Sequence, residues 1–310
     1  MSQDLQTNTQ IQIEIREHEE KRNVFQRFLR RFSGNSLALF AFIVLMIIIA
    51  VSIFAPYIAP YDPTKSDIVH RLQPPSLAAP AKGGFPHILG TDQQGRDVLS
   101  RLIYGGRVSM SVAFTVVAVA GAIGTVIGLI SGYFGGWVDL VFMRLVDIQS
   151  SFPGLLVALT FVMVLGPGQR NLTIALLIVG WMIHARMARS QVLTARESTM
   201  VEASRAIGCS MPRILFGHIL PNVISPLITT YVLEMAHMIE AEANMSFLGY
   251  GIQPPASSWG LMIGEGRQYI TNAWWLVVFP GLIIGITVLC LNLVGNWVRE
   301  EFDPLQKGRH

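Results

Sequence analysis

Charged residues are scarce in this 310-residue sequence. They make up 14% of its positions, against roughly 25% in soluble domains, whereas 51% of the positions are hydrophobic. Only four of the 23 basic residues are lysines, and no Lys/Arg block occurs, which argues against nucleic acid as a partner. The composition indicates a membrane protein.

Cysteines and catalytic signatures are also missing. The two cysteines, Cys209 and Cys290, fall in a predicted cytoplasmic loop and a predicted membrane span, so we expect neither a disulfide nor a zinc site. No Gly-Lys dipeptide occurs, which excludes a Walker A loop, and neither H-E-x-x-H nor G-x-S-x-G is present. The sequence therefore predicts no catalytic residues and no metal site.

Long apolar runs dominate what remains. Three are long enough for a helix to cross a ~30 Å hydrocarbon core, a fourth nearly is, and two shorter or more polar runs complete the set. About 36 mostly polar residues precede the first run, which predicts a permanent membrane anchor and no cleavable signal. The six predicted spans are 37–58, 110–131, 148–165, 172–188, 223–241 and 274–298.

Arginine placement predicts the topology. Five arginines lie between the fourth and fifth runs, and the positive-inside rule places that connection in the cytoplasm, with both termini on the same side. The predicted organisation is a tail with a basic amphipathic surface helix (1–36), a first span (37–58), an extracytoplasmic loop (59–107), a membrane core (108–298) with a cytoplasmic coupling loop (196–222), and a cytoplasmic tail (299–310). The five arginines are Arg186, Arg189, Arg196, Arg205 and Arg213.

Glycines mark two predicted features. Gly124, Gly128 and Gly132 are four residues apart, a spacing that lets membrane helices approach closely, although simple glycine richness would give the same pattern. Before them, an apolar stripe that ends at Gly105 and Gly106 predicts a short interfacial helix on the outer surface, for which we favour a structural role over substrate contact.

The loop between the fourth and fifth runs predicts two short helices. Thr199 and Glu202 have the spacing of a capping box, and Gly208 stands where the first helix would stop. Ser210 can cap the second helix, which we expect to end at Pro221 near the membrane. A compact projection of this kind suits docking to a partner, and a self-contained loop explains the pattern equally well.

Ionisable residues interrupt the fifth run. Glu234, His237 and Glu240 share an arc of about 120° on a helix, and intramembrane ionisable groups usually face a bundle interior or an aqueous cavity. We therefore hypothesise that Glu234 and His237 line a translocation pathway. The alternatives are that these groups satisfy one another and that Glu240 and Glu242 reach water at the outer surface.

In the loop after the fourth run, Glu202-Ala203-Ser204 is followed by Gly208 and then by His218-Ile219-Leu220-Pro221. This pattern resembles the EAA loop of ABC-importer permeases. Ser204 departs from the family, which commonly has alanine there, and His218 stands where an aliphatic residue is frequent. The resemblance implies a coupling helix that docks onto an ATP-binding subunit. The residues that carry this coupling role are Glu202, Ala203, Ser204, Gly208 and Pro221.

The resemblance extends over most of the chain and is closest to permeases of the dipeptide, oligopeptide and nickel class. Asn296 and Trp297 depart from the usual ending of that class. The implied fold is all-α, with six transmembrane helices in the type I, MetI-like arrangement of ABC-importer permeases. The stretches that carry the resemblance are 89–107, 132–139, 246–260, and 274–281 with the tail 292–304.

The resemblance also implies a function. The chain would be a non-enzymatic permease subunit for peptides in the bacterial inner membrane, surrounded by lipid. Its partners would be a second homologous permease, two ATP-binding subunits and an extracytoplasmic solute-binding protein. It would bind no cofactor itself, since ATP and Mg lie on the ATPases. Alternatives are import of nickel or of a glutathione-type compound, an export permease, and an intramembrane metalloenzyme that uses Glu234, His237 and Glu240.

Overall fold

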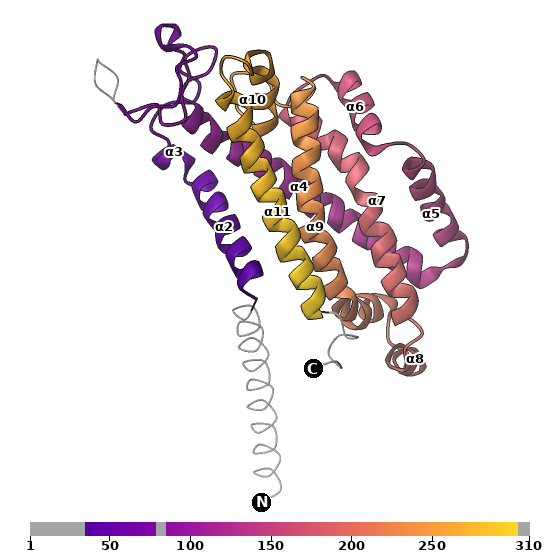
Figure 1. Ribbon diagram of the computed structural model, residues 1–310. Coiled ribbons are helices and arrows are strands. Elements are labelled where there is room, and N and C mark those ends of the chain that lie inside the picture. Colours follow the sequence, from indigo (N-terminus) through magenta and orange to yellow (C-terminus); the bar gives the residue numbers. More distant parts are fainter. Residues whose placement is uncertain (1–34, 79–84, 303–310) are drawn as a thin grey trace, which may run out of the picture.

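The chain folds as a bundle of helices in a computed structural model that describes residues 35–78 and 85–302 (Figure 1). Within those residues the extended pairing is limited to one bridge between Thr91 and Asp97, as the all-α prediction requires. The predicted N-terminal surface helix lies outside the described residues. The helices are α2 (Ser36–Ile53), α3 (Ala55–Ile58), η1 (Ile68–His70), α4 (Val98–Phe134), α5 (Gly136–Ser150), α6 (Gly154–Leu165), α7 (Gln169–Ala195), α8 (Thr199–Ala206), η2 (Arg213–Ile219), α9 (Leu220–Phe247), α10 (Trp259–Gly266), η3 (Arg267–Tyr269) and α11 (Trp275–Phe302).

Five helical segments of the described chain are long and apolar enough to cross a membrane. They are α2, α4, α7, η2 continued by α9, and α11. The bent pair α5 and α6 makes a sixth if it counts as one span. The six predicted runs therefore all fall on helices: four fall on single helices, the first covers α2 and α3, and the third falls on the bent pair.

The third predicted span, 148–165, is wrong as a single helix. Helices α5 and α6 meet at an angle of 87°. Pro153 lies at the break with an extended ψ of 123°, and it has no backbone N–H and disfavours helical geometry at Phe152. The N–H of Ser151 closes α5 on the carbonyl of Asp147 at 3.1 Å. An uncharged run that is nearly long enough to cross the membrane is thus split by one proline.

The predicted close approach of glycines is confirmed along α4. This helix packs lengthwise against α7, and at three successive turns the Cβ of a substituted residue would overlap a Cβ of α7. Small residues of this kind let two membrane helices make backbone contact. The facing pairs, with the separation such a Cβ would have, are Gly124 and His184 at 2.8 Å, Gly128 and Ala188 at 2.6 Å, and Gly132 and Val192 at 2.8 Å.

The prediction that a short helix ends at Gly105 and Gly106 is wrong. Helix α4 is continuous over 37 residues, and Asp97 caps it by accepting the N–H of Ser100 at 2.8 Å. The two glycines have a packing role instead, because a Cβ on Gly106 would lie 2.8 Å from the ring of Trp259. Because they have no side chain, the indole of Trp259 can pack directly against α4, and the helix continues through both glycines.

The connections between helices divide between the two ends of the bundle (Figure 1). The long connections 59–97 and 248–274 share one end with α10, which we call the α10 end. The connection through α8 lies at the other end, near the last turns of α11, which we call the α8 end. This grouping agrees with the predicted separation of the two long loops from the 196–222 loop.

Candidate coupling surface and transport site

Helix α8 forms the projection predicted between α7 and α9. Val201 and Ser204 are buried, and Val201 packs in a cluster with Ile214 and Leu215 of η2. Glu202 and Ala203, on the opposite face, are exposed. Several apolar side chains around them are also exposed, which makes this surface suitable for a protein partner. These apolar residues are Met200, Ile207, Met211 and Phe216.

The ends of α8 differ in part from prediction. The capping box is wrong, because Ser198 occupies the N-cap position, Thr199 is already the first helical residue, and no side chain caps the helix. The stop at Gly208 is confirmed, since its φ of +80° is in the left-handed region that glycine adopts without strain. Ser204 donates its hydroxyl to the carbonyl of Met200 at 2.8 Å, so its hydrogen-bond donor is used within the helix.

Pro221 does not end the second helix of this loop, contrary to the prediction. The chain passes from η2, a π-helical stretch, directly into α9, with Pro221 in the first turn of α9. The N–H of Leu220 donates to the carbonyl of Leu215, five residues back, which is the hydrogen bond of a π-helical turn. This turn comes directly before Pro221, which has no backbone N–H to donate. The projection and α9 therefore form one continuous helical body.

Glu234 and His237 lie together on α9, as their spacing predicted. The His237 Nδ1 is 3.0 Å from Glu234 Oε1. The Glu234 side chain is 10% exposed and that of His237 is 62% exposed, so the pair joins a buried carboxyl to an open surface of the bundle. Glu240, one turn further along, is exposed.

Glu242 does not reach outer-surface water, contrary to one alternative raised from the sequence. Its side chain is fully buried, and Ser246 donates a hydroxyl to its Oε1 at 2.7 Å. The Ser246 Oγ also accepts the N–H of Ile252 at 3.1 Å. This carboxyl therefore holds the segment that follows α9 against the helix.

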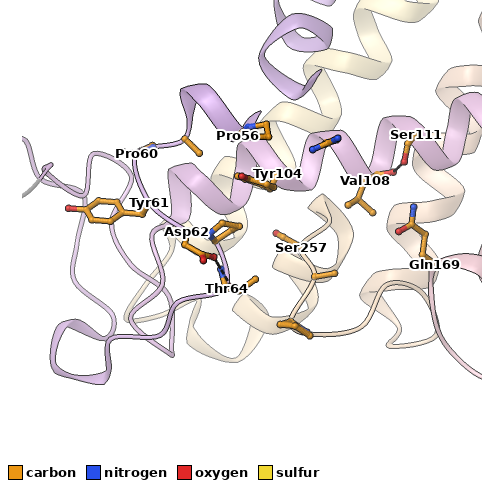
Figure 2. Close-up of a pocket in the computed structure, with 15 residues that line it drawn as sticks. Pro56, Pro60, Tyr61, Asp62, Thr64, Tyr104, Val108, Ser111, Gln169 and Ser257 are labelled. Carbon is orange, nitrogen blue, oxygen red and sulfur yellow. Dashed lines mark hydrogen bonds between the residues drawn. The ribbon is translucent and has the colours of Figure 1, made fainter. Parts of the chain in front are cut away.

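A cavity of about 760 Å³ opens at the α10 end (Figure 2). Its walls come from the segment after α2, the first turns of α4, the start of α7 and the segment before α10. No sequence pattern predicted it, because the four wall segments are far apart in the chain. Its lining residues include Asp62, Tyr104, Arg107, Ser111, Gln169 and Ser257.

The rim of this cavity carries a fixed carboxylate. Asp62 Oδ1 accepts the Thr64 N–H at 2.8 Å and the Thr64 hydroxyl at 2.6 Å. The hydroxyl bond is the main cause that lowers the pKa of Asp62, so the group is anionic at neutral pH. Beside it, burial and the nearby Asp97 carboxylate raise the pKa of Tyr61, which stays a neutral phenol.

A buried charge cluster supports the cavity from behind. Asp92 lies 2.7 Å from Arg96 Nε and 2.5 Å from Arg101 Nη1. Arg101 Nη2 is also 2.7 Å from Glu265 of α10. Both arginines are almost fully buried, although charged side chains usually stay at the surface. The signal available in the sequence was the unusual number of charges of both signs in the 59–107 loop.

Together these features define a class of protein. Several apolar helices span a membrane thickness, and the described residues include no group of three or more His, Cys, Asp or Glu that could hold a metal ion. A helix with an exposed, partly apolar face projects from one end, and a cavity opens at the other. The protein is a polytopic, all-helical membrane protein.

Residues 124–308 match the family described as binding-protein-dependent transport system inner membrane component. Residues 23–75 match the N-terminal transmembrane domain of oligopeptide transport permease C. The chain belongs to this family of binding-protein-dependent transport permeases.

Individual relatives cover nearly the whole chain. The dipeptide transport system permease protein DppC of Haemophilus influenzae is 40% identical over 91% of this chain and 95% of its own length. The di/tripeptide transport system permease protein DppC of Pseudomonas aeruginosa is 38% identical over 91% of this chain and 92% of its own length. The glutathione transport system permease protein GsiD of Pectobacterium atrosepticum is 36% identical over 92% of this chain and 93% of its own length.

A solved structure confirms the fold. The chain is similar to one chain of the inward-facing MetNI methionine ABC transporter, with a TM-score of 0.54 and 18% identity, over 66% of this chain and 98% of that one. Similarity at this level of identity bears on the fold alone, and it agrees with the MetI-like arrangement implied by the sequence.

Proposed function

We propose that the chain is one of two permease subunits of an ATP-binding cassette importer that carries di- or oligopeptides across the bacterial inner membrane. The observation that carries this proposal is the 40% identity to a dipeptide permease over 91% of the chain. The two long connections at the α10 end would face outward, and the α8 end and both termini would face the cytoplasm. Arginines in the connection through α8 support that orientation.

The complete importer would contain partners that supply what this chain lacks. A second homologous permease would complete the pathway, two ATP-binding subunits would supply the energy, and an extracytoplasmic solute-binding protein would deliver the cargo. This subunit would bind no cofactor, because the sequence has no Walker A loop and ATP with Mg would lie on the ATPases. Lipid would cover the remaining apolar helix surface.

Coupling to ATP hydrolysis would act through α8. Its exposed face, with Glu202 and Ala203, would dock on an ATPase, while buried Ser204 and the turn at Gly208 would keep the helix in shape. Helix α8 packs on η2, and η2 continues through Pro221 into α9. A displacement of α8 would therefore move α9 with it. Closure of the ATPases would in this way switch the pathway between its two sides.

Glu234 and His237 would then line the pathway, since they lie on the helix that moves. The carboxylate would meet the ammonium group of a passing peptide, and the His237 ring would hold the carboxylate in place through the 3.0 Å bond. The intramembrane position makes an unpaired charge costly, so the pair offers a site that stays satisfied when no cargo is present.

Glutathione-type import is the second candidate, favoured by the 36% identity to a glutathione permease. Nickel import by the same architecture remains an alternative from the family resemblance. The three differ in cargo and share one architecture, because selection in this class would reside largely with the binding protein. An exporter would differ from all three in requiring no binding protein.

The experiment that tests the proposal is purification of the tagged chain in mild detergent with mass spectrometry of the co-purifying proteins. We expect two ATPases, or one in two copies, and a second permease. The recovered complex is then placed in proteoliposomes and its binding protein is added. Uptake of labelled dipeptide, glutathione and nickel identifies the cargo. Recovery of the chain alone, with bound metal in proportion, would overturn the proposal in favour of a metalloenzyme.

A further inference from the structure

The cavity at the α10 end has the size of a small-molecule site. Its volume of about 760 Å³ falls within the roughly 300–1,000 Å³ of typical ligand pockets. Figure 2 shows Asp62 and Thr64 toward one side of it and Ser111 and Gln169 toward the other, with Ser257 between them. Four separate parts of the chain thus converge on one space.

One wall presents an oxygen acceptor with a fixed direction. Both bonds from Thr64 go to Asp62 Oδ1, and neither goes to Oδ2. The Thr64 bonds hold the carboxylate rotamer without occupying that second oxygen. Asp62 is exposed, so a ligand ammonium group can reach it.

Another wall presents donors that are equally free. The guanidinium of Arg107 on α4 is exposed, and it forms no hydrogen bond or ion pair within the described part of the chain. Ser111 lies one helical turn further along the same face, and because its hydroxyl donates to the Val108 carbonyl at 2.8 Å, it offers a ligand only an acceptor. The side-chain amide of Gln169, at the first residue of α7, likewise has no partner among the described residues. A carboxylate and a peptide group would find matching donors here.

The two charges do not neutralise each other. No ion pair within 4.0 Å joins Asp62 to Arg107 among the described residues, although both line the same cavity. A ligand that satisfies both must carry a cation and an anion at separate positions. An inorganic ion would satisfy one wall and leave the other charge unpaired.

The walls are held in place from behind. Ser257 donates its hydroxyl to the Arg101 carbonyl at 3.0 Å, and the Tyr61 N–H bonds the Ser100 hydroxyl at 3.0 Å. Arg101 belongs to the buried charge cluster that reaches Glu265. Preorganised walls reduce the entropy lost when a ligand binds.

We propose that this cavity is a binding site for zwitterionic peptides, with the peptide ammonium on Asp62 and the peptide carboxylate on Arg107. Gln169 and Ser257 bind the peptide groups between, and Tyr104 with the surrounding prolines contacts the side chains. The site lies where a peptide enters the permease. This inference rests on the proposed peptide cargo and adds a site within this subunit that selects for both free termini.

The test uses the detergent-solubilised complex of permeases and ATPases without binding protein, and saturation-transfer NMR with dialanine, N-acetyl-dialanine and dialanine amide. For the unchanged complex we expect dialanine to bind more tightly than either blocked peptide. Asp62→Asn should weaken dialanine binding about tenfold and abolish discrimination against the acetylated peptide only. Arg107→Gln should abolish discrimination against the amide only.

Arg71→Gln is the matched control, because Arg71 is exposed on the same connection as Asp62 but does not line the cavity. It should leave all three affinities unchanged. Absence of dialanine binding, or equal discrimination in all variants, would overturn the site. Weaker docking of the binding protein by the Asp62 and Arg107 variants, without any peptide signal, would overturn it in favour of a protein-docking surface.

Uptake separates failure of the site from failure of the proposed function. If the complete importer takes up dialanine while the cavity binds none, the site is wrong and the function stands. If the cavity binds dialanine with the expected discrimination while no peptide is taken up, the site stands and the proposed cargo is wrong.

Discussion

The Arg101 guanidinium lies 2.7 Å from the Glu265 carboxylate, although 164 positions separate the two residues in the sequence. Arg101 belongs to the first turn of α4, and Glu265 to α10. Their contact, with Asp92 between Arg96 and Arg101, joins the segment before α4, the start of α4 and α10 at the α10 end. The cavity walls depend on these contacts.

Arg101→Met should therefore destabilise the protein strongly. It leaves Asp92 and Glu265 short of a partner, and loss of one member of a buried ion pair costs ~3–5 kcal/mol. The measurement is the free energy of unfolding in detergent, by SDS titration. Glu240→Gln is the control, because that side chain is exposed and unpaired among the described residues. Equal stability of both variants would mean that the cluster is dispensable.

Gly128→Ala should separate α4 from α7. The added Cβ would lie 2.6 Å from the Ala188 Cβ, and overpacking of this kind typically costs ~1–3 kcal/mol. Gly281→Ala is the matched control, since its Cβ would meet nothing within 4 Å and alanine favours a helix by about 1 kcal/mol. Thermal midpoints in detergent should fall for the first variant only. A lower midpoint for Gly281→Ala alone would contradict the packing argument.

Glu202→Lys and Gly208→Pro should uncouple transport from ATP hydrolysis. The first reverses a charge on the exposed face of α8, and the second forces a negative φ where the chain has +80°. We expect peptide uptake to fall at least tenfold, a loss of about 1.4 kcal/mol, while membrane insertion is unchanged. Glu300→Lys, an exposed site on α11, should retain uptake. Full uptake in both α8 variants would refute the coupling role.

Glu234→Gln should reduce uptake of cationic peptides more than that of neutral ones. The change keeps the shape and a bond to His237, and it removes the negative charge that would meet an ammonium group. Initial uptake rates for lysine-containing and alanine peptides give the ratio, with Glu240→Gln as the control on the same helix. An unchanged ratio, together with unchanged rates, would remove Glu234 from the pathway.

Local patterns in the sequence predicted most of the membrane helices and several contacts, but not every helix end. The apolar runs have the length of membrane spans. The glycines of α4 are spaced about one helical turn apart, and Gly208 stands at a position that needs a left-handed backbone. The projecting helix of the coupling loop was predicted for the same reason. Each of these depends on residues a few positions apart.

The sequence by itself thus determined the class of fold, the number of apolar segments and the place of α8. Only the tertiary structure decided that Arg101 meets Glu265, that Glu242 is buried, and that four distant segments enclose a cavity around Asp62 and Arg107. The physical reason is that periodicity and chain stiffness act over a few residues. Pairing of buried charges depends on which helices come together in space, and sequence distance carries no record of that.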